Sequence, residues 1–142
     1  MSSNMKKNTE QVVELAMLLR THGVAPTQQR LSIAQVLLSK PQHLSADQVL
    51  ATVNRNADEV SKATVYNTLK LFAANGLLRE VIVDPTRVFY DSTTQPHYHI
   101  FNADTGELTD IAADAVTVSG LPPLPRGTVS AGIDVVLRVR NG

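Results

Sequence analysis

The hydrophobic pattern of this chain changes its period at Asn75-Gly76, and the change separates a helical front from a β-rich remainder. Within residues 12–74, apolar side chains recur every three to four positions, which is the spacing of one helix face. After Gly76 the apolar runs are short and lie between turn residues, as is typical of strands. The sequence therefore predicts an α+β fold with its helices first.

Start and stop signals predict four helices in the front half. They cover approximately residues 12–23, 26–41, 45–53 and 61–76. Ser45 and Gln48 form a capping box at the start of the third helix, and Ser61 caps the fourth. Gly23 and Gly76 supply the flexible residues that end the first and fourth helices.

A β-hairpin is predicted directly after the fourth helix. The apolar runs 77–83 and 88–90 are separated by Asp84-Pro85-Thr86-Arg87, whose Asp and Pro suit a type I turn. Short helices followed by a hairpin are the order of a winged helix-turn-helix, in which the helix before the wing enters the major groove of DNA. We therefore expect an N-terminal winged helix-turn-helix in residues 1–90 and a small α/β dimerisation domain in residues 91–142.

The fourth helix has a polar face opposite its apolar stripe. This face carries cations, hydrogen-bonding groups and an aromatic ring, namely Lys62, Thr64, Tyr66, Asn67 and Lys70. Such a mixture suits contact with phosphates and base edges, and it is equally compatible with an ordinary solvated helix face. Charge adds a weak preference for DNA: residues 1–80 hold nine Lys/Arg and six Asp/Glu (+3), and residues 81–142 hold four and seven (−3).

Composition limits the chemistry that the chain can perform. Its 142 residues contain no cysteine, so disulfides, thiolate catalysis and cysteine-bound zinc are excluded. Any metal must be held by nitrogen or oxygen ligands. No apolar run is long enough to span a membrane, and the first residues lack the apolar core of a signal peptide, so we expect a cytoplasmic protein without a membrane partner.

A candidate metal site surrounds the segment PHYHIFNADTGELTD, residues 96–110. His97 and His99 lie two apart on a predicted strand and therefore share a face. Asp91 and Asp110 are expected on neighbouring strands, and His43 in the turn before the third helix. Three imidazoles and two carboxylates would suit Fe²⁺ or Mn²⁺, whereas the alternative is an ordinary surface hairpin.

The remainder of the chain is predicted to be short elements around a connector. A short helical or irregular element is expected from about residue 112, a Pro/Gly-rich connector at 120–127 and a last strand at 135–139. The expected second domain, residues 91–142, is too short to bury enough surface for comfortable stability alone. We therefore expect homodimerisation through its sheet.

Four motifs in this order resemble the ferric uptake regulator family. They are GVAPTQQR (23–30), HLSADQV (43–49), SKATVYNTLKLFAANGL (61–77) and HYH…TGELTD (97–110). The resemblance implies a homodimeric repressor that binds double-stranded operator DNA under the control of one regulatory metal per protomer. Its implied metal ligands are His43, Asp91, His97, His99 and Asp110. Its implied DNA contacts include Tyr66 and Asn67 at base edges. Arg30 in the first motif and Arg87 in the wing are further candidate DNA contacts.

Details of the motifs point to particular branches of the family. Asp91 resembles the peroxide-sensing branch, in which bound Fe²⁺ and peroxide oxidise a ligand histidine; by that analogy His43 and His97 are the oxidation candidates. Asn102 and Thr105 stand where a zinc-binding CxxC would start and end, so no structural zinc is expected. The absence of cysteine also resembles haem-responsive iron regulators, which keeps haem open as a cofactor. A non-haem metalloenzyme is the remaining, remote alternative.

Overall fold

The computed structural model describes residues 2–55 and 59–142. The chain divides into two compact units, the first ending at Thr94 and the second running from Gln95 to Gly142. In the described ranges, none of the helices combines the length and the apolar character needed to cross a membrane.

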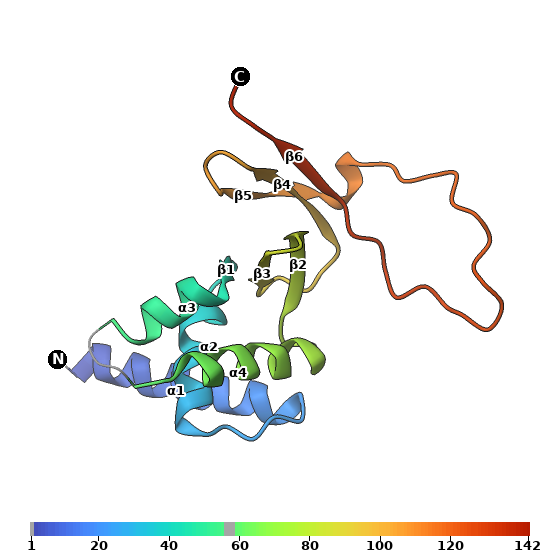
Figure 1. Cartoon of the computed structure of the whole chain (residues 1–142). Coiled ribbons are helices and arrows are strands. Elements are labelled where there is room, and N and C mark those ends of the chain that lie inside the picture. The colour runs from blue at the N-terminus through green and yellow to red at the C-terminus, as the bar shows by residue number, and fades with distance from the viewer. Residues whose placement is uncertain (1, 56–58) are drawn as a thin grey trace. The chain divides into compact units, whose positions relative to one another are not determined.

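The first unit is built on four helices, as the sequence predicts (Figure 1). Within the described residues they are α1 (Ser2–Thr21), α2 (Gln28–Leu37), α3 (Ala46–Val53) and α4 (Lys62–Ala74). Their apolar faces meet in a core that includes the fully buried Ile33, Leu69 and Phe72. Helix α1 begins ten residues before the predicted stripe at residue 12, because residues 2–11 contain neither Gly nor Pro to end a helix.

The predicted caps hold the ends of these helices. At the start of α3, the Gln48 amide N–H donates to the Ser45 hydroxyl (3.2 Å) and the Ser45 amide donates to the Gln48 side chain (2.8 Å). Gly76 has a φ of 77°, which allows the amide of Leu77 to reach the carbonyl of Phe72 at 2.9 Å and so close the end of α4. These contacts fix where α3 begins and where α4 ends.

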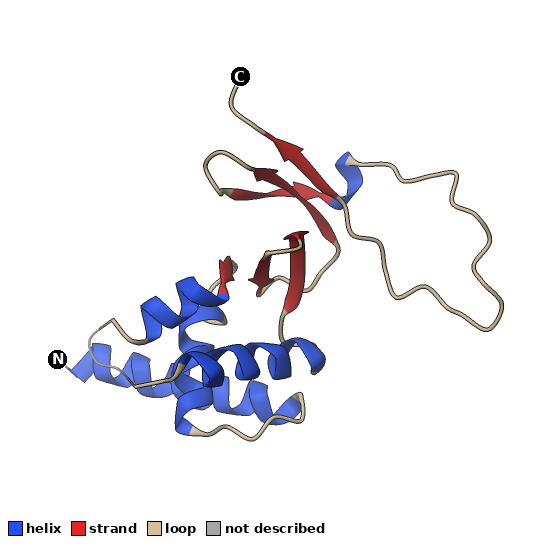
Figure 2. Cartoon of the chain, in the orientation of Figure 1, coloured by secondary structure: helices blue, strands red, loops and turns tan. Residues whose placement is uncertain are grey.

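A three-stranded antiparallel sheet completes the first unit (Figure 2). Its order is β1 (His43–Ser45), β3 (Arg87–Asp91) and β2 (Arg79–Asp84), so β2 and β3 form the predicted wing. The prediction that His43 lies in a turn is wrong. His43 begins β1, which pairs with a strand more than forty residues away, and a local pattern cannot reveal such a pairing.

The second unit contains a separate three-stranded sheet. Strand β4 (His97–Asn102) pairs antiparallel with β5 (Leu108–Ala112) and parallel with β6 (Val136–Val139). The 3₁₀ turn η1 (Ala113–Ala115) matches the short element expected near residue 112. A long loop then runs out from the sheet and returns to β6 (Figure 1). Among the described residues of this unit, the buried hydrophobic side chains are Phe101 and Leu108.

The boundary between the units falls four residues later than the division expected after residue 90. Asp91 is the last residue of β3 and pairs with both His43 and Arg79, which ties it to the first sheet. Ser92 continues this attachment, since its amide donates to the Gln42 carbonyl at 2.9 Å and its hydroxyl to the Lys40 carbonyl at 3.0 Å.

The capping box makes a testable contribution to stability. We expect Ser45→Ala to lower the free energy of unfolding by about 1 kcal/mol, because the Gln48 amide loses its acceptor. Urea unfolding followed by circular dichroism measures this change. Ser119→Ala, in the exposed loop, is the matched control and should change the stability little; equal stability of both variants would contradict the role given to the cap.

Candidate functional site

Two imidazoles and a carboxylate converge on one face of the second sheet. His97 and His99 lie two apart on β4, and Asp110 on β5 is the register partner of His99. The Nε2 atoms of His97 and His99 lie 3.7 Å and 3.4 Å from Oδ1 of Asp110. Each of the three residues offers a ligand atom within 4.8 Å of the others. This spacing brings nitrogen and oxygen donors to one point, as a divalent metal requires.

Hydrogen bonding fixes which nitrogen of His97 is available. Its Nδ1 lies 2.7 Å from the carbonyl oxygen of Gln95. Because a carbonyl can only accept, Nδ1 carries the proton of the neutral ring and the lone pair is then on Nε2, the nitrogen that lies 3.7 Å from Asp110. Metal-binding histidines typically have their second nitrogen held in this way. His99 has only 4% of its side chain exposed, and its backbone amide is bonded to Val135 at 3.2 Å.

The other two predicted ligands belong to the first unit. His43 on β1 and Asp91 on β3 are register partners, so their side chains lie on the same face of that sheet. Asp91 is 1% exposed, and its Oδ1 accepts a hydrogen bond from the Thr93 amide at 2.9 Å. We expected Asp91 and Asp110 on neighbouring strands, but they belong to separate sheets, because β3 pairs with β1 and β2 whereas β5 pairs with β4.

His22, the remaining histidine of the chain, has a structural role. Its Nδ1 lies 2.9 Å from the carbonyl oxygen of Leu18, so the ring serves one of the last carbonyls of α1.

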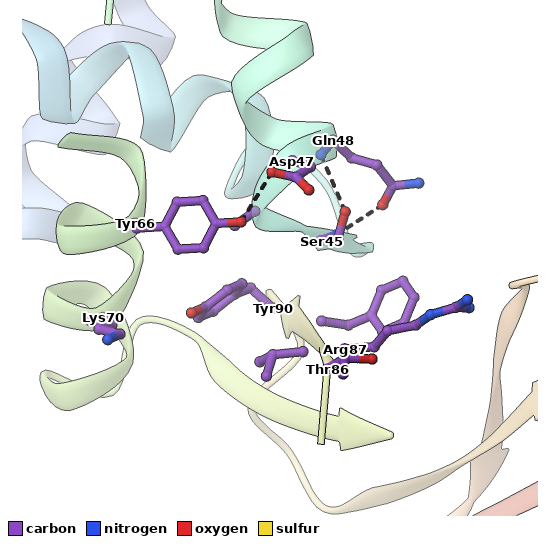
Figure 3. A pocket seen from close by; sticks show the side chains of 11 residues that line it. Ser45, Asp47, Gln48, Tyr66, Lys70, Thr86, Arg87 and Tyr90 are labelled. Carbon is purple, nitrogen blue, oxygen red and sulfur yellow. Dashed lines mark hydrogen bonds between the residues drawn. The ribbon is translucent and has the colours of Figure 1, made fainter. Parts of the chain in front are cut away.

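The predicted DNA-contact residues line two hollows of the first unit. Thr64 and Asn67 of α4 line a hollow of about 440 Å³ together with Arg30 of α2. On the other side of α4, a hollow of about 480 Å³ is lined by residues that include Tyr66, Lys70 and Arg87 (Figure 3). Lys62 joins this second group, since its Nζ lies 5.6 Å from the centroid of the Tyr66 ring. All seven residues therefore lie on α4 or line a hollow beside it.

The starts of α2 and α4 are electrostatically suited to anions. Neither helix has an acidic residue in its first turn, and α4 begins with Lys62. A cation at a helix N-terminus opposes the helix dipole, whereas a phosphate there is stabilised by it. The Arg30 side chain is restrained by a hydrogen bond from its Nη1 to the carbonyl oxygen of Ala25 at 3.0 Å. These features suit a surface that contacts anions.

Sequence reasoning missed one residue beside this surface. The hydroxyl of Tyr66 donates to Oδ1 of Asp47 at 3.0 Å, a contact between α4 and the first turn of α3. This bond, with some burial and the negative charge of Asp47, raises the pKa of Tyr66. Asp47 carries no local signal for such a role, because the two residues are 19 positions apart.

Comparison with known proteins identifies the family. The model of the ferric uptake regulator family matches residues 21–120. This chain belongs to that family. The peroxide-responsive repressor PerR of Staphylococcus epidermidis is 30% identical over 110 residues, which cover 78% of this chain and 73% of the relative. PerR of Staphylococcus aureus is also 30% identical over 110 residues, covering 78% and 74%.

Solved structures of the family share the fold. The ferric uptake regulator of Pseudomonas aeruginosa with manganese has a TM-score of 0.65 at 28% identity, covering 88% of this chain and 96% of its own. The ferric uptake regulator of Vibrio cholerae has a TM-score of 0.70 at 21% identity, covering 89% and 98%, and supports the fold alone. Members of the ferric uptake regulator (Fur) family are transcriptional regulators rather than enzymes, so the metalloenzyme alternative is set aside.

The tautomer of His97 in this Fur-family chain can be measured directly. We expect Nδ1 to be protonated and Nε2 to be bare in the metal-free protein, because the Gln95 carbonyl accepts from Nδ1. Long-range ¹H–¹⁵N correlation of the imidazole nitrogens distinguishes the two tautomers of a neutral ring. His22 should show the same tautomer. A proton on Nε2 of His97 would contradict the assignment.

Proposed function

We propose that this chain is a metal-dependent, DNA-binding transcriptional repressor that senses peroxide. Its regulatory Fe²⁺ or Mn²⁺, one per protomer, would be held by His43, Asp91, His97, His99 and Asp110. The observation that carries the proposal is the convergence of two imidazoles and a carboxylate on β4 and β5. Relatives at 30% identity that are named peroxide-responsive repressors support the signal. A DNA-binding repressor of this kind would act in the cytoplasm.

The donor set fits Fe²⁺ or Mn²⁺ in number and charge. Five nitrogen and oxygen ligands exceed the four that Zn²⁺ usually takes. The carboxylates of Asp91 and Asp110 together balance a divalent cation, which allows a ligand as buried as Asp91 to remain ionised. With no cysteine in the chain, we propose no structural zinc beside this regulatory site.

In this proposal the two units would contribute different ligands, and that division would provide a means of regulation. His43 and Asp91 belong to the unit with α4 and the wing, whereas His97, His99 and Asp110 belong to the second unit. The five side chains can hold one ion only in conformations that bring both sets together. Metal would favour DNA binding to the extent that those conformations also suit the operator.

Peroxide would act on the ligands themselves. Fe²⁺ held by these side chains would activate peroxide next to imidazoles that can be oxidised: one peroxide oxygen would be inserted into an imidazole C–H bond, and the other would leave as water. His43 and His97 are the proposed targets. Loss of either imidazole as a ligand would remove the link between the units and release the operator.

The surface of α4 would carry the DNA contacts. Lys62, Lys70, Arg30 and Arg87 would meet phosphates, and Thr64, Tyr66 and Asn67 would meet base edges. The absence of acidic residues in the first turns of α2 and α4 supports this orientation.

The metal site is tested first without DNA. We expect His99→Ala to weaken Mn²⁺ binding at least tenfold, because the substitution removes a buried donor that faces Asp110. Isothermal titration calorimetry on the metal-free protein measures the affinity. His22→Ala is the matched control, since that histidine serves the end of α1. Unchanged binding by His99→Ala, or equal losses in both variants, would place the metal elsewhere.

The repressor function is tested with a DNA duplex selected from a random pool by the Mn²⁺-loaded protein. We expect Mn²⁺ to tighten binding of this duplex by wild type and not by His43→Ala, because His43 belongs to the ligand set of the DNA-binding unit. Fluorescence anisotropy measures both affinities. Selection of no duplex, or an equal response to Mn²⁺ in the variant, would contradict the proposal.

The peroxide signal has a separate readout. Fe²⁺-loaded protein treated with peroxide should release the duplex and gain one oxygen atom on the peptide that contains His43 or His97. Mass spectrometry locates the gain. Release without oxidation of these peptides would favour another signal, and a saturable Soret band on adding haem would identify haem as that signal.

The sheet of the second unit, together with the loop that leads into β6, supplies the proposed dimer interface. It buries few hydrophobic side chains of its own, while Leu121, Leu124 and Val129 of its loop are 62%, 58% and 90% exposed. A second copy of the chain would cover them and complete a core too small to be stable alone.

We therefore expect the double substitution Leu121→Ser and Leu124→Ser to shift the chain from dimer to monomer, because the loop loses apolar area that a partner would bury. Sedimentation velocity measures the assembly. Val13→Ser with Met17→Ser, at exposed positions of α1, is the control and should leave the dimer intact. If the loop variant remains dimeric at the same dilutions as wild type, this interface is ruled out.

A further inference from the structure

Tyr66 is held at its hydroxyl end by a residue from another helix. Its oxygen donates to Oδ1 of Asp47 at 3.0 Å, and Figure 3 shows the ring directed from α4 toward the first turn of α3. The bond joins an exposed carboxylate to a half-buried phenol. It therefore limits the rotation of a side chain that would otherwise sample several orientations beside α4.

The face of the same ring has a second contact. Lys62 lies one helical turn before Tyr66, and its Nζ is 5.6 Å from the ring centroid. A cation in this position is attracted to the face of the ring. With Asp47 at the hydroxyl and Lys62 over the face, the ring is restrained at two places.

Asp47 is a well-supported anchor for this purpose. It lies in the first turn of α3, where the helix dipole favours a negative charge. The capping box of Ser45 and Gln48 fixes the start of that helix. The acceptor therefore has a defined position, and its hydrogen bond raises the pKa of Tyr66, which favours the protonated phenol.

An aspartate at this place opposes the binding of a polyanion. It borders the same hollow as Lys70 and Arg87, cations that suit phosphates. A carboxylate there weakens non-specific attraction to DNA, which depends on neutralising phosphate charge. The hydrogen bond from Tyr66 offers a reason for an aspartate at this position: it orients the Tyr66 ring.

We propose that Asp47 is a positioning residue that orients Tyr66 for sequence-selective contact with DNA. The inference rests on the proposed function, in which α4 faces the major groove. With its hydroxyl engaged by Asp47, Tyr66 presents its ring to the bases and makes an apolar contact, as with the methyl group of thymine, in place of a hydrogen bond to a base edge. Asp47 thus increases selectivity while lowering general affinity for DNA.

A double-mutant cycle tests this role in the full-length, Mn²⁺-loaded protein. The variants are Asp47→Ala, Tyr66→Phe and their combination, and the probes are the selected duplex and a scrambled duplex of the same composition. We expect each single variant to weaken binding of the selected duplex by about fivefold and the double variant to be no weaker than either, because both remove the same bond. Binding of the scrambled duplex should not weaken.

Two further variants separate positioning from charge. Asp47→Asn keeps an acceptor oxygen without the charge and should recover part of the selectivity lost in Asp47→Ala. Glu10→Gln removes an exposed acid from α1 and should leave the selectivity unchanged. If Asp47→Ala and Asp47→Asn instead tighten both duplexes alike, Asp47 acts through charge alone and the proposal is wrong. Additive losses in the double variant would also overturn it.

A titration without DNA tests the contact itself. Ultraviolet detection of tyrosinate should show that Asp47→Ala lowers the pKa of Tyr66 toward the ordinary tyrosine value, with Tyr66→Phe identifying the signal. An unchanged pKa would remove the structural basis of the inference. If wild type binds no duplex, the proposed function fails; if wild type binds the selected duplex but the losses in the double variant are additive, only the positioning role fails.

Discussion

The pairing of β1 with β3 is the interaction on which the account of this protein depends. Three residues of β1 join the wing to the start of α3, and the register sets His43 opposite Asp91. Ser45, the last residue of that strand, is also the N-cap of α3. One short strand therefore positions a pair of candidate ligands and, through α3, the carboxylate of Asp47 that binds Tyr66. Disturbing the ladder would affect the candidate ligand pair and the proposed DNA-binding surface together.

Local rules accounted for much of the fold. The capping box, the N-cap at Ser61 and the glycine at the end of α4 were visible in the sequence because each depends on residues within one helical turn. The HxH pair and Asp110 were equally accessible, since a hairpin brings neighbouring strands together. Strand β1, the placement of Asp91 in the first sheet and the bond from Tyr66 to Asp47 were not, because each joins residues far apart in the chain.

Each unit has a feature that lowers the stability of the isolated chain. The start of α4 leaves a helix dipole without an acidic partner, which lowers the stability of the helix in isolation and prepares it for an anion. The second unit has few buried hydrophobic residues and an exposed apolar loop, which suggests that it gains stability from partners rather than from its own core. In both cases a feature that is unfavourable in the isolated chain becomes favourable when the proposed ligand or second copy binds.

The central claim is that one ion links the DNA-binding unit to the second unit, so metal binding and DNA binding must be coupled in both directions. The direct measurement is a pair of affinities: that of the selected duplex with and without Mn²⁺, and that of Mn²⁺ with and without the duplex. Thermodynamic linkage requires the two ratios to be equal, and the account predicts that both are well above one. A ratio of one in both titrations, with Mn²⁺ still bound at His99, would contradict it.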